Sequence, residues 1–132
     1  MNLELLTDLR RLARGRREYC RVPEALDPLP FQVDHVISRQ HGGRTVPENL
    51  AWSCLHCNKH KGPNIASHDP LTGKLVPLFH PRRQDWDRHF SWNGAKLVGR
   101  TRNGRATIRV LAINDPNSVA FRAELMDEAV FW

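Results

Sequence analysis

Residues 34–62 read DHVISRQHGGRTVPENLAWSCLHCNKHKG, and this stretch decides how the chain folds. It begins with Asp34 and His35 inside an apolar run, VDHVIS at residues 33–38, whose β-branched residues are typical of a buried strand. Burying an unpaired carboxylate is costly, so Asp34 must have a partner, reach water or bind a cation. Strand alternation also sends Asp34 and His35 to opposite faces, so we expect the strand to end, bend or bulge at this point.

Short elements separated by clear breaks follow from the residue patterns. They predict a strand over residues 31–37, a second strand over residues 50–53 and a helix over residues 54–61. Gly42 and Gly43 mark a long polar connection between the strands. Gly62 and Pro63 end the helix, because Gly suits the cap and Pro cannot continue the helix. The predicted order is therefore strand, loop, strand, helix.

The same stretch carries an ordered set of polar, glycine and cysteine positions. They are Asp34-His35, Gly42-Gly43, Asn49-Leu50, Cys54, Cys57-Asn58 and Lys61-Gly62. In this order they resemble the HNH endonuclease family, over about residues 17–62 of the chain. Downstream, the segments DPLTG, LFHPR, HFSW and GRAT look like a C-terminal extension found in a bacterial subgroup of that family. The resemblance implies an α+β protein with a ββα-metal core that cleaves nucleic acid, leaving 5′-phosphate and 3′-hydroxyl ends.

The resemblance also implies roles for single residues. His35 is expected to be the general base, because an imidazole can take a proton from water near neutral pH. Asn49 occupies the family position that braces the loop and orients the histidine. Asp34 and Asn58 offer oxygen ligands to one hard divalent cation, Mg2+ or Mn2+, which would stabilise the leaving oxygen. The candidate phosphate contacts are Arg39, Arg44, Lys59 and Lys61.

The three cysteines are Cys20, Cys54 and Cys57, and an odd number argues against a disulfide framework. Many HNH proteins hold a structural zinc with two Cys-x-x-Cys pairs, but Arg17 stands here where the first cysteine would be. A closed zinc site wants four ligands, so zinc is in doubt, with His60 as a conceivable fourth ligand. We expect the three cysteines to converge in this degenerate zinc knuckle. We also expect Arg17→Cys to complete the site, without disrupting packing if position 17 already faces the cysteines.

The formal net charge of +6 favours a polyanionic partner, nucleic acid first. Of the two nucleic acids we expect DNA as the partner, although the sequence itself does not choose between DNA and RNA. The excess is concentrated near the N-terminus, where Arg10, Arg14 and Arg17 are candidate contacts, although a solvated helix face explains such charges equally well. No apolar stretch approaches the ~20 residues that span a bilayer, and the N-terminus lacks a secretory pattern, so a cytoplasmic location without membrane contact is expected. The sequence does not predict an oligomeric state. The rival functions are a non-catalytic nucleic-acid-binding module and a structural zinc-knuckle interaction protein.

The flanks are predicted to belong to one domain spanning residues 1–132, with a core over about 17–63 and an extension over about 64–132. A basic amphipathic helix is predicted over residues 2–14, and a short strand over residues 75–79. Asn93-Gly94 indicates a hairpin with a type I′ turn. Residues 104–113 fit either a helix or a strand, and Asp115-Pro116 is typical of a helix start.

Overall fold

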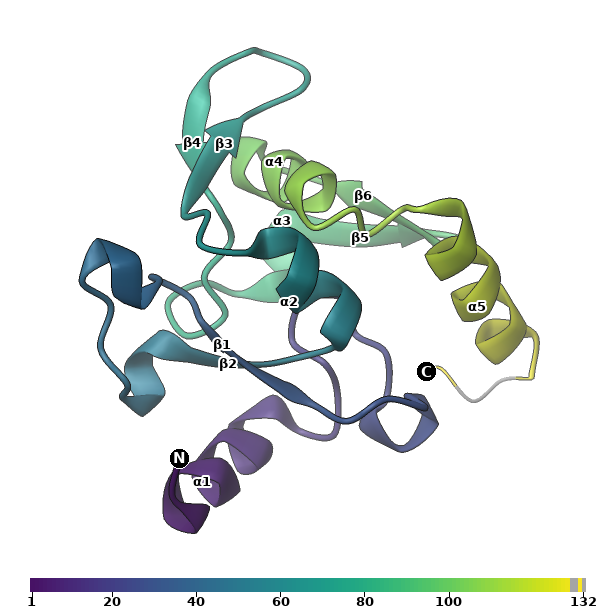
Figure 1. Ribbon diagram of the computed structural model, residues 1–132. Coiled ribbons are helices and arrows are strands. Elements are labelled where there is room, and N and C mark those ends of the chain that lie inside the picture. Colours follow the sequence, from purple (N-terminus) through teal and green to yellow (C-terminus); the bar gives the residue numbers. More distant parts are fainter. Residues whose placement is uncertain (129–130, 132) are drawn as a thin grey trace. The chain divides into compact units, whose positions relative to one another are not determined.

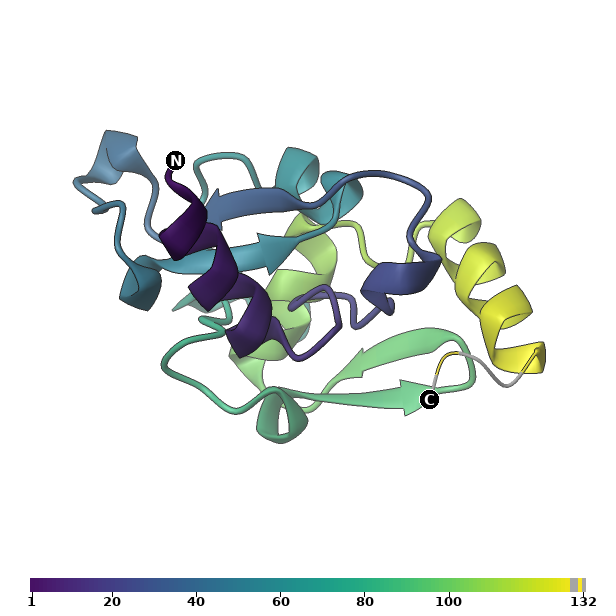
Figure 2. The same ribbon diagram turned by 90° about the horizontal axis from the view of Figure 1, so that it is seen from below.

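A computed structural model describes residues 1–128 and 131 (Figures 1 and 2). The described chain forms two compact units, which we treat separately. The first unit comprises Met1–Ile65 and His80–Arg83, and the second comprises Ala66–Phe79 and the described residues from Gln84 onward. Both units mix helices with small antiparallel sheets, so the predicted α+β class is confirmed. The predicted single domain over residues 1–132 stays a prediction.

The first unit opens with α1 (Leu3–Ala13), which begins where the Asn2 side chain accepts a hydrogen bond from the backbone N–H of Leu5. Arg14 ends the helix in the left-handed conformation, at the last residue of the predicted range 2–14. The helix lies across β2 (Leu50–Ser53) in Figure 2. Its apolar face buries Leu9 and Ala13 against Leu50 and Trp52. This small apolar cluster fixes the helix on the sheet.

The strand–strand–helix core is formed by β1 (Gln32–His35), β2 and α2 (Leu55–Lys61). The strands are antiparallel, with Asp34 opposite Ala51 and His35 opposite Leu50. Cys54 caps α2, because its sulfur accepts a hydrogen bond from the N–H of Cys57. Short 3-10 turns lie before β1 and in the connection between the strands, at Glu24–Leu26, Arg39–His41 and Pro47–Asn49. The predicted first strand was too long, since it ends at His35.

The second unit holds two hairpins and three helices among the described residues. The hairpins pair β3 (Ala66–His68) with β4 (Leu75–Pro77) and β5 (Phe90–Asn93) with β6 (Lys96–Gly99). The helices are α3 (Trp86–His89), α4 (Arg102–Val110) and α5 (Pro116–Asp127). The patterns missed β3 and left α4 ambiguous. The start of α5 was predicted correctly, because Asp115 caps its first turn.

The predicted turn between β5 and β6 is present but is of a different type. Asn93 pairs with Lys96, so Gly94 and Ala95 are the two central residues. Gly94 has a positive φ of 59° and Ala95 does not share it, which is the pattern of a type II′ turn rather than type I′.

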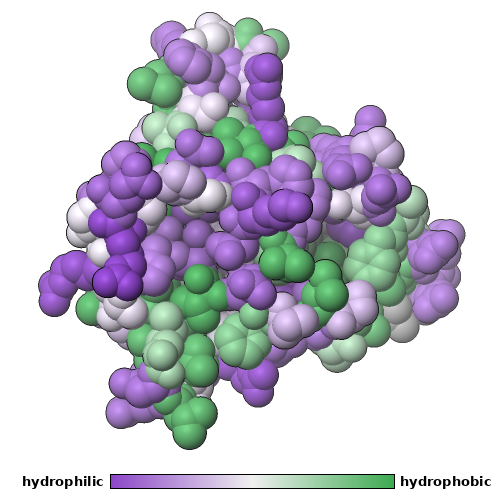
Figure 3. Space-filling model, in the orientation of Figure 1, coloured by the Kyte–Doolittle hydropathy of each residue, from purple (hydrophilic) through white to green (hydrophobic). Residues whose placement is uncertain are grey.

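The face in Figure 3 is largely hydrophilic, with smaller hydrophobic patches between the polar side chains. Within the described residues, no helix has the length and apolar character needed to cross a bilayer.

Candidate functional site

The buried carboxylate of Asp34 has two partners. Its side chain points inward and is 3% exposed. The Tyr19 hydroxyl donates to Oδ2 at 2.6 Å, and the Lys61 ammonium donates to Oδ1 at 3.2 Å. Burial raises the pKa of the Asp34 carboxyl, while the Lys61 charge and the Tyr19 hydrogen bond oppose that shift. Of the three alternatives for Asp34, a partner, water or a cation, the structure shows partners, and both carboxylate oxygens accept hydrogen bonds from protein groups.

His35 lies on the opposite face from Asp34, at the last position of β1. Its Nε2 atom is 2.9 Å from Oγ1 of Thr45, and its Nδ1 atom has no hydrogen-bond partner among the described residues. Partial burial lowers the pKa of His35, and the nearby charges of Arg39 and Lys61 act in the same direction, against Asp34. The lowered pKa favours the neutral form of the ring, and Nδ1 is left available to a substrate or water.

Asn49 holds together the loop that follows β1. Its Oδ1 accepts from the N–H of Ile37, and its Nδ2 donates to the carbonyl oxygens of Ile37 and Arg44, each at 2.9 Å. The loop passes so close that a Cβ on Gly43 would lie 1.6 Å from the Ile37 carbonyl oxygen. Only glycine fits at that position, and the tight loop brings Thr45 to His35.

The predicted phosphate contacts divide into two groups. Arg39, Arg44 and Lys59 are exposed, so a polyanion could reach them. Lys61 is fully buried, and its ammonium donates to Asp34 and to the carbonyl oxygens of His35 and Val36. The prediction that Lys61 contacts phosphate is therefore wrong for this structure, because nothing outside the protein can reach its charge.

Asn58 lies on α2, three residues before Lys61, so the two share one face of the helix. It is half-buried. Its helix face is the one that carries Lys61 to Asp34. The role of Asn58 as a cation ligand stays a prediction.

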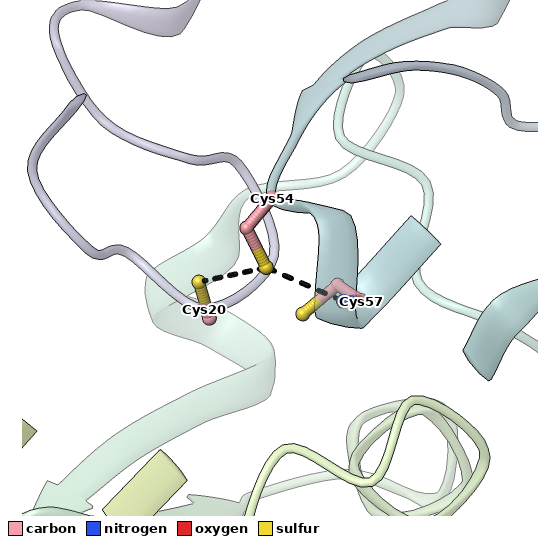
Figure 4. A group of neighbouring side chains, drawn as sticks. All are labelled: Cys20, Cys54 and Cys57. Atoms are coloured by element: carbon pink, nitrogen blue, oxygen red, sulfur yellow. Dashed lines mark hydrogen bonds between the residues drawn. The ribbon is translucent and has the colours of Figure 1, made fainter. Parts of the chain in front are cut away.

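The three cysteines converge, as Figure 4 shows. Their sulfur atoms lie within 4.8 Å of one another, and the sulfurs of Cys20 and Cys54 are 3.8 Å apart. Hydrogen bonds from Cys20 and then Cys57 lower the pKa of Cys54 to about 3, while the same contact with Cys54 raises the pKa of Cys20 to about 12. A thiolate is therefore already favoured at the centre of the group, which suits a soft cation.

No histidine or carboxylate of the described residues joins the cysteine group. His60, considered as a fourth ligand, instead places its Nδ1 2.8 Å from the carbonyl oxygen of His56. Three thiolates fill three of the four positions that a closed zinc site needs. The chain's own residues therefore fit zinc only in part.

Arg17 is 2% exposed, so its guanidinium group is buried and is not a surface charge. Its Nε donates to Asp27 at 2.9 Å, and its other guanidinium nitrogens contact Glu24 and the carbonyl oxygen of Leu29. We therefore now expect Arg17→Cys to disturb packing, because the change would remove a buried cation from its carboxylate partners. For the same reason Arg17 is not an accessible contact for nucleic acid.

Two residues of the site were missed by reasoning from the sequence. Thr45 contacts His35, and Tyr19 contacts Asp34. Neither residue type signals such a role. Thr45 reaches His35 only because the loop at Gly43 folds tightly, and Tyr19 reaches Asp34 only because the segment before β1 packs against the strand.

Residues 18–64 match the family model for HNH endonucleases. No curated protein and no solved structure matches the chain. The matched segment contains β1, β2 and α2 together with His35, Asn49 and the cysteine group.

Proposed function

Because residues 18–64 belong to the HNH endonuclease family, we propose that this protein is a metal-dependent endonuclease that hydrolyses phosphodiester bonds of nucleic acid. The proposed substrate is DNA rather than RNA, and the proposed products carry 5′-phosphate and 3′-hydroxyl ends. The observation that carries the proposal is the geometry of His35: the imidazole stands at the end of β1, is partly buried, holds Thr45 through Nε2 and leaves Nδ1 without a hydrogen-bond partner among the described residues.

The chain's own residues would act as follows. His35 takes a proton from a water molecule, which makes that water a better nucleophile toward phosphorus. Thr45 limits rotation of the ring through Nε2, and Asn49 keeps the loop that carries Thr45 closed. The exposed charges of Arg39, Arg44 and Lys59 attract the phosphate backbone.

A divalent cation would supply Lewis-acid stabilisation of the charge that develops on the phosphate and the leaving oxygen. Asn58, which is half-buried on α2, offers an amide oxygen. Asp34 fits less well, because it is buried and both oxygens already accept hydrogen bonds from Tyr19 and Lys61. Its role as a ligand remains a prediction that a binding measurement can test.

A zinc ion at Cys20, Cys54 and Cys57 would have a structural role. Cys20 precedes β1 and the other two lie at the start of α2, so a shared ion would tie the N-terminal segment to the helix. It would contribute to stability rather than to the reaction.

The experiment is incubation of a supercoiled plasmid with the purified protein. Conversion to nicked or linear DNA is expected with Mg2+ or Mn2+ and not with excess chelator. Ligation of the products without prior phosphatase or kinase treatment checks for 5′-phosphate and 3′-hydroxyl ends. A parallel incubation with single-stranded RNA tests the preference for DNA.

A non-catalytic nucleic-acid-binding module is the second candidate. The engagement of Asp34 by Lys61 favours it, since a buried ion pair at a ligand position leaves fewer groups for a cation. Retarded migration of DNA with no strand cleavage under any divalent metal would support this candidate against the first.

A further inference from the structure

Lys61 occupies an unusual place for a lysine. It is the last residue of α2, and its side chain is fully buried. Its ammonium group has three N–H donors and three acceptors: Oδ1 of Asp34 at 3.2 Å, the carbonyl oxygen of His35 at 3.2 Å and that of Val36 at 3.0 Å. All hydrogen-bonding capacity of the ammonium is therefore used inside the protein.

Two of those acceptors are consecutive backbone carbonyls. In a regular strand, neighbouring carbonyl oxygens point to opposite sides, so one group cannot bind both. The convergence of the His35 and Val36 oxygens on one ammonium marks the point where β1 stops being a strand. Lys61 therefore contacts the peptide unit of His35 itself.

The carboxylate completes this arrangement. A buried ammonium requires a counter-ion, and Asp34 is the acidic partner of Lys61. Tyr19 donates to the other carboxylate oxygen, so the charge of Asp34 is also satisfied. The three side chains come from the segment before β1, from β1 and from α2, and they meet at Asp34, the residue before His35.

We propose that Lys61 is a positioning residue that fixes the backbone of His35, and that Asp34 serves as its counter-ion rather than as a ligand of the divalent cation. The effect on cleavage rests on the proposed function, in which His35 is the base. The effect on the conformation of His35 does not rest on it, so the two can be tested separately.

Lys61→Met alone leaves Asp34 buried without its cation and could prevent folding. The double variant Lys61→Met, Asp34→Asn removes both charges at once and keeps an acceptor for Tyr19. Circular dichroism confirms that the variants fold. Lys59→Met, an exposed lysine on the same helix, is the matched control for conformation.

The first readout is the NMR spectrum of histidine-labelled protein, with the His35 ring signals assigned by their disappearance in His35→Ala. The double variant is expected to shift the His35 ring signals and to weaken protection of the Ile37 amide from hydrogen exchange, while Lys59→Met changes neither. Unmoved His35 signals in the folded double variant would overturn the positioning role, whether or not the wild type cleaves DNA.

The second and third readouts are kinetics and metal binding by calorimetry. The double variant should fall at least about tenfold in kcat with KM within about twofold, as expected when the change disturbs geometry and leaves binding intact. Lys74→Met, on the β3–β4 turn, is the kinetic control. Unchanged kcat with a raised KM would overturn the proposal in favour of a phosphate contact, and weakened Mg2+ or Mn2+ binding in Asp34→Asn would overturn it in favour of a cation ligand. If the wild type does not cleave DNA but the NMR result is as expected, the proposed function is refuted and the positioning role of Lys61 is retained.

Discussion

The brace made by Asn49 gives a prediction whose size follows from the structure. Asn49→Ala removes three hydrogen bonds, one to the N–H of Ile37 and two to the carbonyl oxygens of Ile37 and Arg44. At about 1 kcal/mol each, the decrease in the free energy of unfolding is about 3 kcal/mol. With a urea m-value of about 1–3 kcal/mol/M, the midpoint should fall by about 1–3 M.

Asn49→Asp makes the test sharper because the shapes of the two side chains are nearly the same. Aspartate keeps the acceptor for Ile37 but turns the donor into an oxygen that faces two carbonyl oxygens. We therefore expect Asn49→Asp to be at least as destabilising as Asn49→Ala at pH 7. Asn64→Ala, at an exposed position after α2, should stay within about 0.5 kcal/mol of the wild type.

Urea unfolding followed by circular dichroism and tryptophan fluorescence measures these changes. A wild-type midpoint for Asn49→Ala would refute the brace. Wild-type stability in Asn49→Asp would show that the amide nitrogen does not face the carbonyl oxygens.

Three further predictions concern charge, pH and zinc. Replacing the exposed residues Arg39, Arg44 and Lys59 with Gln should make DNA affinity less dependent on salt. In fluorescence anisotropy, the slope of log affinity against log salt should become shallower by about 0.9 for each phosphate that the variant no longer neutralises. An unchanged slope would mean that these charges are only solvated. Burial, with the charges of Arg83 and Arg82, lowers the pKa of His80 from 6.5 to about 4. As the pH falls, this histidine therefore takes up a proton in the unfolded chain at a higher pH than in the folded chain. The free energy of unfolding should then decrease as the pH drops from 6.5 toward 4. His80→Gln should weaken that dependence in urea titrations at several pH values, whereas an identical dependence would contradict the assignment. Metal analysis of protein purified without added zinc should find well under one chelator-resistant zinc per chain. Arg17→Cys should raise that zinc occupancy while lowering the stability of the zinc-free protein. Stoichiometric zinc in the wild type would mean that a fourth ligand exists.

The core could be predicted because its local signals agree with its tertiary contacts. Residues 50–53 are uniformly buried, so the apolar run alone located β2. The cap at Cys54 and the break at Gly62-Pro63 located α2, and the ordered motif indicated that the three cysteines meet. In each case the residue type and its spacing carry the physical cause.

Other features depend on contacts between residues distant in the sequence. The burial of Lys61 depends on the backbone just after β1, at Val36, which lies 25 residues away along the chain. An ordinary lysine is exposed, so its type predicted a phosphate contact. Strand β3 was missed because Ala66-Ser67-His68 contains no β-branched residue and no Phe, Tyr or Trp, so its strand propensity is low. Its hydrogen-bonded pairing with β4 holds it in the strand conformation.

The burial of Arg17 also could not be predicted from its neighbours in the sequence. Among clustered arginines it looked like one more solvated charge, but its partners Asp27 and Glu24 lie beyond Pro23 in a segment without periodicity. No local pattern distinguishes it from the exposed Arg14.

The central claim is that His35 is the base of a metal-dependent cleavage reaction. The direct measurement is the single-turnover rate of DNA cleavage by His35→Ala beside His41→Ala, which changes an exposed histidine in the connection after β1. We predict that His35→Ala is slower by a factor on the order of 10²–10⁴ while binding Mg2+ or Mn2+ as the wild type does, and that His41→Ala cleaves normally. Equal cleavage by His35→Ala and the wild type, from preparations free of other nucleases, would contradict the account.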